Sequence, residues 1–131
     1  TVYELHGSTL RNYCVDCGKF YDVDFITGST GVPRCTVCGG IVKPDVVLYE
    51  ECLDEATMAG AIAAIRKADT LIIGGTSLVV YPAAGLIHYF RGRHLVVINM
   101  QPTAADRSAD LCIAKPIGQV LSEEVCLDDA L

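Results

Sequence analysis

The chain has 131 residues, of which 51% are hydrophobic, so it is long enough to bury the core of one ordinary domain. Its formal net charge of −6 argues against a broad nucleic-acid surface, because phosphate binding requires clustered Lys and Arg side chains. Seven cysteines without a recognisable signal peptide favour a reducing, cytoplasmic compartment, where paired cysteines serve as metal ligands rather than disulfides.

The first segment, residues 1–11, is predicted to be a short strand and loop that carry His6. The sequence does not start with Met, and this strand runs directly into polar residues of a functional kind, so we expect the chain to begin inside a domain. A lone histidine in such a place is more often a strand-end residue bonded to backbone than a catalytic base. The residue by itself leaves both roles open.

Two Cys-x-x-Cys pairs follow, separated by seventeen residues: Cys14 with Cys17, and Cys35 with Cys38. This spacing is typical of a four-cysteine zinc site. Gly18 and Gly39 each follow a second ligand, where they permit the positive φ of a tight knuckle. A closed shell of four sulfurs leaves no position for water, so the predicted zinc is structural and His6 is not one of its ligands.

The segment between the two pairs favours a strand that ends in a Gly/Ser/Pro turn, because it contains Phe20, Tyr21, Val23, Phe25 and Ile26. Residues 12–43 are therefore predicted to form a zinc ribbon. The alternative is a set of buried free thiols at accidental spacing. The remaining cysteines show no paired spacing and are predicted to be core thiols: Cys52, Cys112 and Cys126.

From residue 44 to 131 short apolar runs alternate with helical patterns. Runs of this kind predict strands buried on both faces of a parallel sheet, and they occur at 46–49, 71–73, 95–98 and 111–113. The fold class is therefore α/β, with a partial Rossmann-like parallel sheet, helices and an inserted four-cysteine zinc ribbon.

Three helices are expected between and after these strands. Asp54 caps a helix whose apolar face holds Met58, Ala61, Ile62 and Ile65. Pro82 suits the first turn of a second helix that stops near Gly92, and a last helix carries Ile117, Val120, Leu121 and Val125.

The uncharged stretch from Thr70 to Phe90 also tests whether the chain crosses a membrane. Two glycines, two hydroxyl residues and Pro82 interrupt its middle, and interrupted backbone is costly in lipid. The stretch therefore predicts a strand, a glycine turn and a new helix, and we expect no membrane span.

Ligands of an open parallel sheet bind at the carboxyl ends of its strands. One predicted strand ends in Gly74, followed by Gly75, Thr76 and Ser77, and the next ends in Asn99. The glycine turn lacks a complete G-x-G-x-x-G fingerprint and is a weak signal alone. Asn99 can bond ribose hydroxyls, or it can simply form the turn before Gln101 and Pro102, and the residue does not decide between them.

Several stretches gain specificity from their order and spacing: ELHGS at 4–8, the four cysteines, KPDVVLYEE at 43–51, GTSLVVYPAA at 75–84 and VIN at 97–99. In this order the sequence resembles the sirtuins, the NAD-dependent protein-lysine deacetylases (deacylases), of bacterial type. The resemblance covers residues 3 to about 125 and follows the second half of the family pattern. It implies an acyl transfer from lysine to ADP-ribose with release of nicotinamide.

The resemblance also implies roles for individual residues. His6 would be the general base that deprotonates a ribose hydroxyl, and the cofactor would contact Gly75, Thr76, Ser77, Asn99, Met100, Gln101 and Ile117. An acyl-lysine peptide would enter as an added strand between two extended segments, and its contacts would include Val47, Tyr49, Glu50, Glu51, Val79 and Val80. His88 and His94 receive no role and are expected to be surface or packing residues.

The sequence departs from the family pattern in two ways. Glu50 stands where many members have Gly, which restricts the backbone and adds a negative charge that favours basic substrate segments. The glycine-rich phosphate loop, the arginine-bearing cofactor loop and the Asn-x-Asp motif of the family's first half are not in these 131 residues. We therefore expect the 131 residues alone to be inactive, and an exposed sheet edge to favour self-association.

Two other functions remain alternatives at this point. One is a zinc-ribbon adaptor that binds protein partners and performs no chemistry. The other is an enzyme that uses the same cofactor for ADP-ribosyl transfer.

Overall fold

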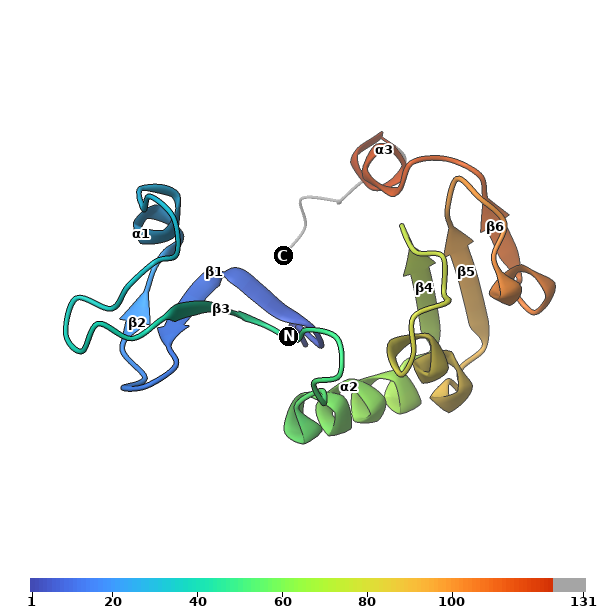
Figure 1. Ribbon diagram of the computed structural model, residues 1–131. Coiled ribbons are helices and arrows are strands. Elements are labelled where there is room, and N and C mark those ends of the chain that lie inside the picture. The colour runs from blue at the N-terminus through green and yellow to red at the C-terminus, as the bar shows by residue number, and fades with distance from the viewer. Residues whose placement is uncertain (124–131) are drawn as a thin grey trace, which may run out of the picture. The chain divides into compact units, whose positions relative to one another are not determined.

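The computed structural model describes residues 1–123 of the chain, which form two compact units. The first unit is Thr1–Met58 and the second begins at Ala59. Each unit contains its own three-stranded sheet (Figure 1). The predicted divisions after residues 11 and 43 both lie inside the first unit and stay predictions.

The sheet of the first unit is antiparallel and has the order β2-β1-β3, made of β1 (Gly7–Cys14), β2 (Phe20–Tyr21) and β3 (Val42–Val46). Its small core contains Cys14, Tyr21, Cys35 and Val42, with Phe25 and Ile26 packed against them. The pairing of β1 with β3 shifts register between Ser8 and Asn12. The buried Asn12 side chain satisfies its amide by donating to the carbonyl oxygens of Thr9 and Tyr21.

A short helix, α1 (Val23–Thr27), replaces the strand predicted through Ile26. Its start is capped by Asp22, whose carboxylate accepts the backbone N–H of Phe25 at 2.9 Å. The turn also brings the rings of Tyr21 and Phe25 to 4.2 Å between centroids. The strand prediction was wrong here because a local cap and an aromatic contact outweigh the strand preference of three apolar residues.

The predicted buried strand at 46–49 was also wrong. β3 ends at Val46, while Leu48 and Tyr49 are 52% and 101% exposed. The backbone N–H of Glu51 donates to the Leu48 carbonyl, which closes a turn. Pairing with β1 uses residues 42–46, so the apolar run contributes its first residue to the zinc-bearing sheet and the rest to a turn.

The second unit contains the predicted parallel sheet, in the order β4-β5-β6, made of β4 (Thr70–Gly74), β5 (His94–Ile98) and β6 (Leu111–Ile113). Ile73, Leu95, Val97 and Ala105 form its buried core. The prediction that these strands are buried on both faces is wrong at Ile72 and Leu111, which are about half exposed. Successive strand residues point to opposite faces, and these two side chains point away from the covered side.

The predicted helix after Asp54 is α2 (Glu55–Lys67), which spans the division between the units. The Asp54 carboxylate accepts both the backbone N–H and the hydroxyl of Thr57 at 2.7 Å. The element after Pro82 is a 3₁₀ helix, η1 (Ala83–Tyr89), and a second one, η2 (Ala104–Arg107), was not predicted. The last helix, α3 (Ile117–Glu123), contains three of its predicted apolar residues, and the fourth, Val125, lies outside the described residues.

The uncharged stretch from Thr70 to Phe90 folds as β4, a glycine turn and η1. Among residues 1–123 no helix has both the length and the apolar character needed to span a bilayer.

Candidate active site and metal centre

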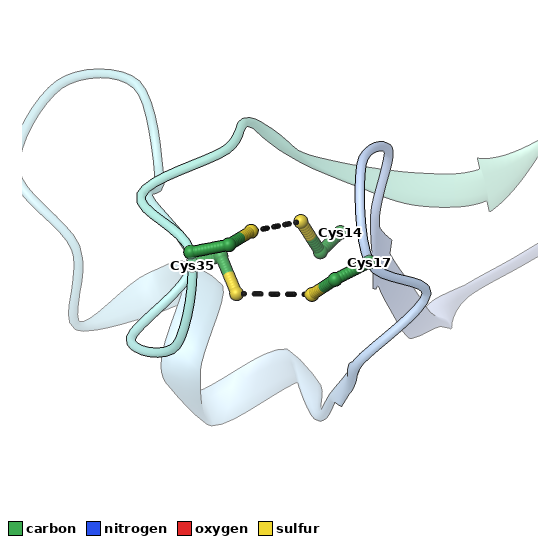
Figure 2. Close-up of side chains that lie close together, drawn as sticks. Cys14, Cys17 and Cys35 are labelled. Atoms are coloured by element: carbon green, nitrogen blue, oxygen red, sulfur yellow. Dashed lines mark hydrogen bonds between the residues drawn. The ribbon is translucent and has the colours of Figure 1, made fainter.

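The four paired cysteines of the first unit converge, and their sulfur atoms all lie within 4.8 Å of one another. Sγ atoms are 3.4 Å apart in Cys14 and Cys38, and 3.5 Å apart in Cys17 and Cys35. Figure 2 shows the labelled side chains pointing toward a common centre. A zinc ion about 2.3 Å from four tetrahedral sulfurs would separate them by about 3.8 Å, so the arrangement fits zinc.

Two tight turns place these sulfurs. The N–H of Gly18 donates to the Cys14 carbonyl at 3.0 Å, and the N–H of Gly39 donates to the Cys35 carbonyl at 2.9 Å. Both glycines have positive φ, of 70° and 77°, as the sequence predicted. A Cβ at either position would meet no atom within 4 Å, so backbone conformation rather than crowding requires glycine there.

The surroundings of the sulfur cluster shift the pKa values of two of its thiols in opposite directions. The Tyr21 hydroxyl donates to the Cys35 sulfur at 3.2 Å and lowers the pKa of Cys35 to about 5. For Cys38, a hydrogen bond from the Gly40 backbone lowers the pKa, but neighbouring ligand sulfurs and burial outweigh it and raise the pKa to about 12. Zinc binding would therefore displace thiol protons. The role of Tyr21 was not predicted, because its contact joins residues fourteen positions apart.

His6 lies in the turn just before β1 and is exposed. It is not part of the sulfur cluster, so the zinc shell and the histidine are two separate sites of the first unit. The His6 carbonyl accepts the N–H of Val47 at 3.1 Å, whereas its imidazole has no hydrogen-bond partner among residues 1–123. Gly7 has a φ of 73°, and a Cβ there would overlap the Asp45 carbonyl oxygen, so the turn next to His6 requires glycine.

A charged clamp braces the segment that contains His6. The Arg11 guanidinium donates from Nη1 to Glu4 at 2.6 Å and from Nε to Asp45 at 2.9 Å. These three side chains are part exposed, so their ion pairs contribute little to the free energy of unfolding. Their effect is to hold β1 and β3 in a fixed arrangement next to His6. The sequence contained no signal for it, because Arg11 and Asp45 are far apart along the chain.

The predicted cofactor residues meet at one edge of the parallel sheet in the second unit. Gly74 is in register with Ile98, and Ile98 with Ile113, so the three strands end side by side. The residues that follow these ends are Gly75, Thr76, Ser77, Asn99, Met100 and Gln101, and α3 begins nearby at Ile117. A Cβ on Gly74 would overlap the Ile117 side chain, which therefore packs against the glycine turn.

The polar groups at this edge make hydrogen bonds within the protein and keep further donors and acceptors for a ligand. Gly75 has a φ of 61° and donates its N–H to the Ile98 carbonyl at 3.1 Å. The Thr76 hydroxyl accepts the N–H of Leu78, while Ser77 is exposed. The Asn99 amide donates to the Gln101 carbonyl at 2.7 Å, and its side-chain oxygen has no donor within the described part of the chain.

The predicted substrate segment at 47–51 is a turn rather than an extended strand. The Glu51 carboxylate accepts the N–H of Leu48 at 2.9 Å and an ion pair from Lys43 at 3.1 Å. The Leu48 N–H and then Lys43 hold the pKa of Glu51 below its ordinary value. Glu50 has a φ of 71°, the left-handed region that favours glycine, which is the residue that the resemblance predicts at this position. In the second unit, Val79 and Val80 are exposed and lie outside any strand.

Within the described part of the chain, the remaining cysteines and histidines take no part in either site. Cys52 and Cys112 are exposed, so their prediction as core thiols was wrong. Cys52 follows the turn at 48–51, and the Cys112 thiol lies near the surface of β6, where it donates to the Asp106 carbonyl of η2 at 3.8 Å. Cys126 lies outside the described residues. His88 and His94 are exposed, in keeping with the predicted surface role.

Comparisons with known proteins agree with this architecture. The sequence model of the Sir2 family matches residues 1–82. An NAD-dependent protein deacetylase of Clostridium perfringens is 69% identical over 125 residues, which are 95% of this chain and 51% of that protein. A solved Sir2 structure with a p53 peptide and NAD⁺ is 35% identical, with a TM-score of 0.80, and the match covers 95% of this chain and 55% of that one.

A further Sir2 structure holds the inhibitor EX-527, 2′-O-acetyl-ADP-ribose and a deacetylated p53 peptide. It is 33% identical, with a TM-score of 0.80, and the match covers 95% of this chain and 56% of that one. The chain is thus an α/β protein that joins a partial Rossmann-like sheet to a four-cysteine ribbon. The chain belongs to the Sir2 (sirtuin) family. It spans about half the length of the curated relatives that it matches.

Proposed function

We propose that the protein acts as an NAD-dependent protein-lysine deacetylase (deacylase), with His6 as general base. The observation that carries this proposal is the separation of His6 from the sulfur shell, combined with family membership. A histidine bound to zinc would be unable to accept a proton, whereas the His6 imidazole has no protein partner among residues 1–123. Imidazole suits the role because it exchanges a proton near neutral pH.

NAD, when bound, would supply the ADP-ribose acceptor for the acyl group and nicotinamide as leaving group. On this chain Gly75, Thr76 and Ser77 would contact the adenosine side, where the positive φ of Gly75 allows close backbone approach. The side-chain oxygen of Asn99, which has no donor among residues 1–123, is suited to accept a hydrogen bond from a ribose hydroxyl. Met100, Gln101 and Ile117 would flank the adenine.

The proposed substrate is an acylated lysine within a protein or peptide. The Val47 carbonyl has no donor among the described residues, so it is free to accept the N–H of the acylated lysine side chain. Tyr49 is fully exposed and would line the acyl channel, beside Glu50 and Glu51. Val79 and Val80 of the second unit, which are exposed and lie outside any strand, would also contact the substrate.

Zinc would hold the ribbon without taking part in the reaction, because four sulfurs leave no open coordination position. Thiolate ligands persist in reducing surroundings, which supports our proposal of a cytoplasmic location.

The test uses a chimera in which this chain replaces the matching half of the Clostridium perfringens relative. His6→Ala should lower deacetylation of an acetylated peptide by about 10²- to 10⁴-fold while zinc content and NAD binding stay unchanged. His94→Ala, at another exposed histidine, should leave turnover unchanged. Equal activity of His6→Ala and the unmodified chimera would refute the proposal, and product mass would separate deacylation from ADP-ribosyl transfer.

A further inference from the structure

A cavity of about 560 Å³ lies wholly within the second unit, between η1, the loop after it, the start of β5 and η2. No residue predicted to hold the cofactor lines this cavity. Arg93 and Leu95 line it at the amino end of β5, whereas the predicted cofactor residues follow the carboxyl ends of the strands. The cavity is therefore separate from the site already described.

The walls of this cavity are largely apolar. Leu78, Ile87, Phe90 and Leu95 line it, and each also belongs to, or packs against, the buried core of the second unit. A cavity that shares its walls with a packed core is preformed, and its size is within the range of about 300–1,000 Å³ that small-molecule sites occupy. An apolar part of a ligand would therefore replace water against fixed side chains.

Two arginines, Arg91 and Arg93, supply the positive charge of the cavity. Arg91 donates from Nη1 to the carbonyl oxygens of His88 and Phe90, both at 2.7 Å, which fixes its guanidinium at the end of η1. Within residues 1–123 its other N–H groups have no protein acceptor, and neither does the guanidinium of Arg93. The Arg91 guanidinium, held by two bonds with N–H groups left over, is suited to bind a planar anion in bidentate fashion, and Arg93 adds a second positive charge.

Charge balance sets the kind of anion. Two arginines and one carboxylate, Asp110, give the lining a formal charge of 2 − 1 = +1, in a chain whose net charge is −6. The Asp110 carboxylate lines the cavity. It accepts the N–H of Leu95 at 2.8 Å, and this bond holds the negative charge in place. It repels a doubly charged phosphate more strongly than a singly charged carboxylate.

We propose that this cavity binds a small organic carboxylate with an apolar body. The carboxylate would lie on Arg91 and Arg93, and the apolar body would pack between Leu78, Ile87 and Leu95.

The test is a titration of the ¹⁵N-labelled, zinc-loaded chain, followed by amide chemical shifts. Octanoate should give saturable shifts centred on Ala84, Leu95 and Ala105. 1-Octanol, which has the same chain without the charge, should bind at least about tenfold more weakly, and inorganic phosphate should give no saturable shift there. Equal binding of octanoate and 1-octanol, or saturable shifts confined to other residues, would overturn the proposal.

Two variants and one control sharpen this test. Arg93→Gln should weaken octanoate binding by about tenfold, and Ala104→Phe, at an exposed lining position of η2, should block the cavity. Arg34→Gln removes an exposed arginine of the first unit and should leave binding unchanged. Equal losses in Arg93→Gln and Arg34→Gln would mean non-specific attraction to positive charge and would reject the site. Amide spectra free of ligand report whether each variant keeps its fold.

Discussion

The two units of this protein have cores of opposite character. The buried core of the first unit contains Cys14 and Cys35, two of the four sulfur ligands, beside Tyr21 and Val42. The buried core of the second unit consists of aliphatic side chains above a parallel sheet. A segment as short as the ribbon buries too little apolar surface to fold by itself, so metal binding must supply much of its stability. The second unit depends on apolar packing instead.

Loss of a zinc ligand should have the largest effect and should be confined to one unit. Cys35→Ser removes a buried sulfur, so we expect zinc content to fall to near zero and the amide signals of the β2-β1-β3 sheet to collapse. Amide signals of the parallel sheet should persist. Cys112→Ser, at an exposed cysteine, is the matched control and should retain zinc. If zinc-free Cys35→Ser kept a folded ribbon, the first unit would not depend on metal binding for its stability, and the contrast between the two units would be wrong.

A core truncation in the second unit should have the converse effect. Ile73→Ala removes a buried side chain from β4 and should lower the free energy of unfolding of this unit by about 2–5 kcal/mol. Ile72→Ala, on the adjacent but half-exposed position, should cost much less. Denaturant unfolding followed at amides of the parallel sheet measures both changes. Equal losses in the two variants would show that the exposed face of β4 is packed in solution.

The strained turn at Glu50 should respond more modestly. Glu50→Gly relieves the left-handed conformation and should stabilise the first unit by about 1 kcal/mol. In the chimera it should also weaken the binding of peptides with Lys or Arg beside the acyl-lysine, because a negative charge is lost. Glu50→Gln removes the charge and keeps the strain, so it should weaken such peptides without stabilising the unit. Unchanged peptide affinity in both variants would discard the charge hypothesis.

The smallest expected effect is a local titration in the same turn. The Leu48 N–H, and then Lys43, lower the pKa of Glu51, so the contribution of this carboxylate is present above the ordinary Glu pKa and lost as pH falls through the lowered value. The Leu48 amide shift should titrate with a midpoint below that of ordinary glutamate. Glu51→Gln should abolish the titration, whereas Lys43→Met should only raise its midpoint. A Leu48 midpoint at the ordinary value would contradict the assigned hydrogen bond.

The sequence predicted elements whose signal is local and strong. The runs that form β4, β5 and β6 are apolar and bounded by turn residues, and the Asp54 cap indicated the start of α2. The cluster of four sulfurs could be predicted from the sequence, because two Cys-x-x-Cys pairs at this separation are typical of one four-cysteine metal site. These features needed no knowledge of distant contacts.

Features that depend on distant partners were missed. The apolar run at 46–49 looked like a strand, but pairing with β1 ends at Val46 and leaves Tyr49 exposed. The Tyr21 hydroxyl meets the Cys35 sulfur only after the ribbon closes, and the Arg11 clamp joins residues from two strands. Neither contact has a pattern along the sequence. The roles predicted for the cofactor and substrate residues stay predictions, to be tested as above.

The compact placement of the sulfur ligands also has a consequence for biosynthesis. All four lie between residues 14 and 38, and β3, which completes their sheet, ends at Val46. Every group that the metal needs therefore leaves the ribosome before the strands of the parallel sheet do. The ribbon can bind its ion and become ordered on the nascent chain, so zinc starvation should act on newly made protein more than on molecules that have already matured.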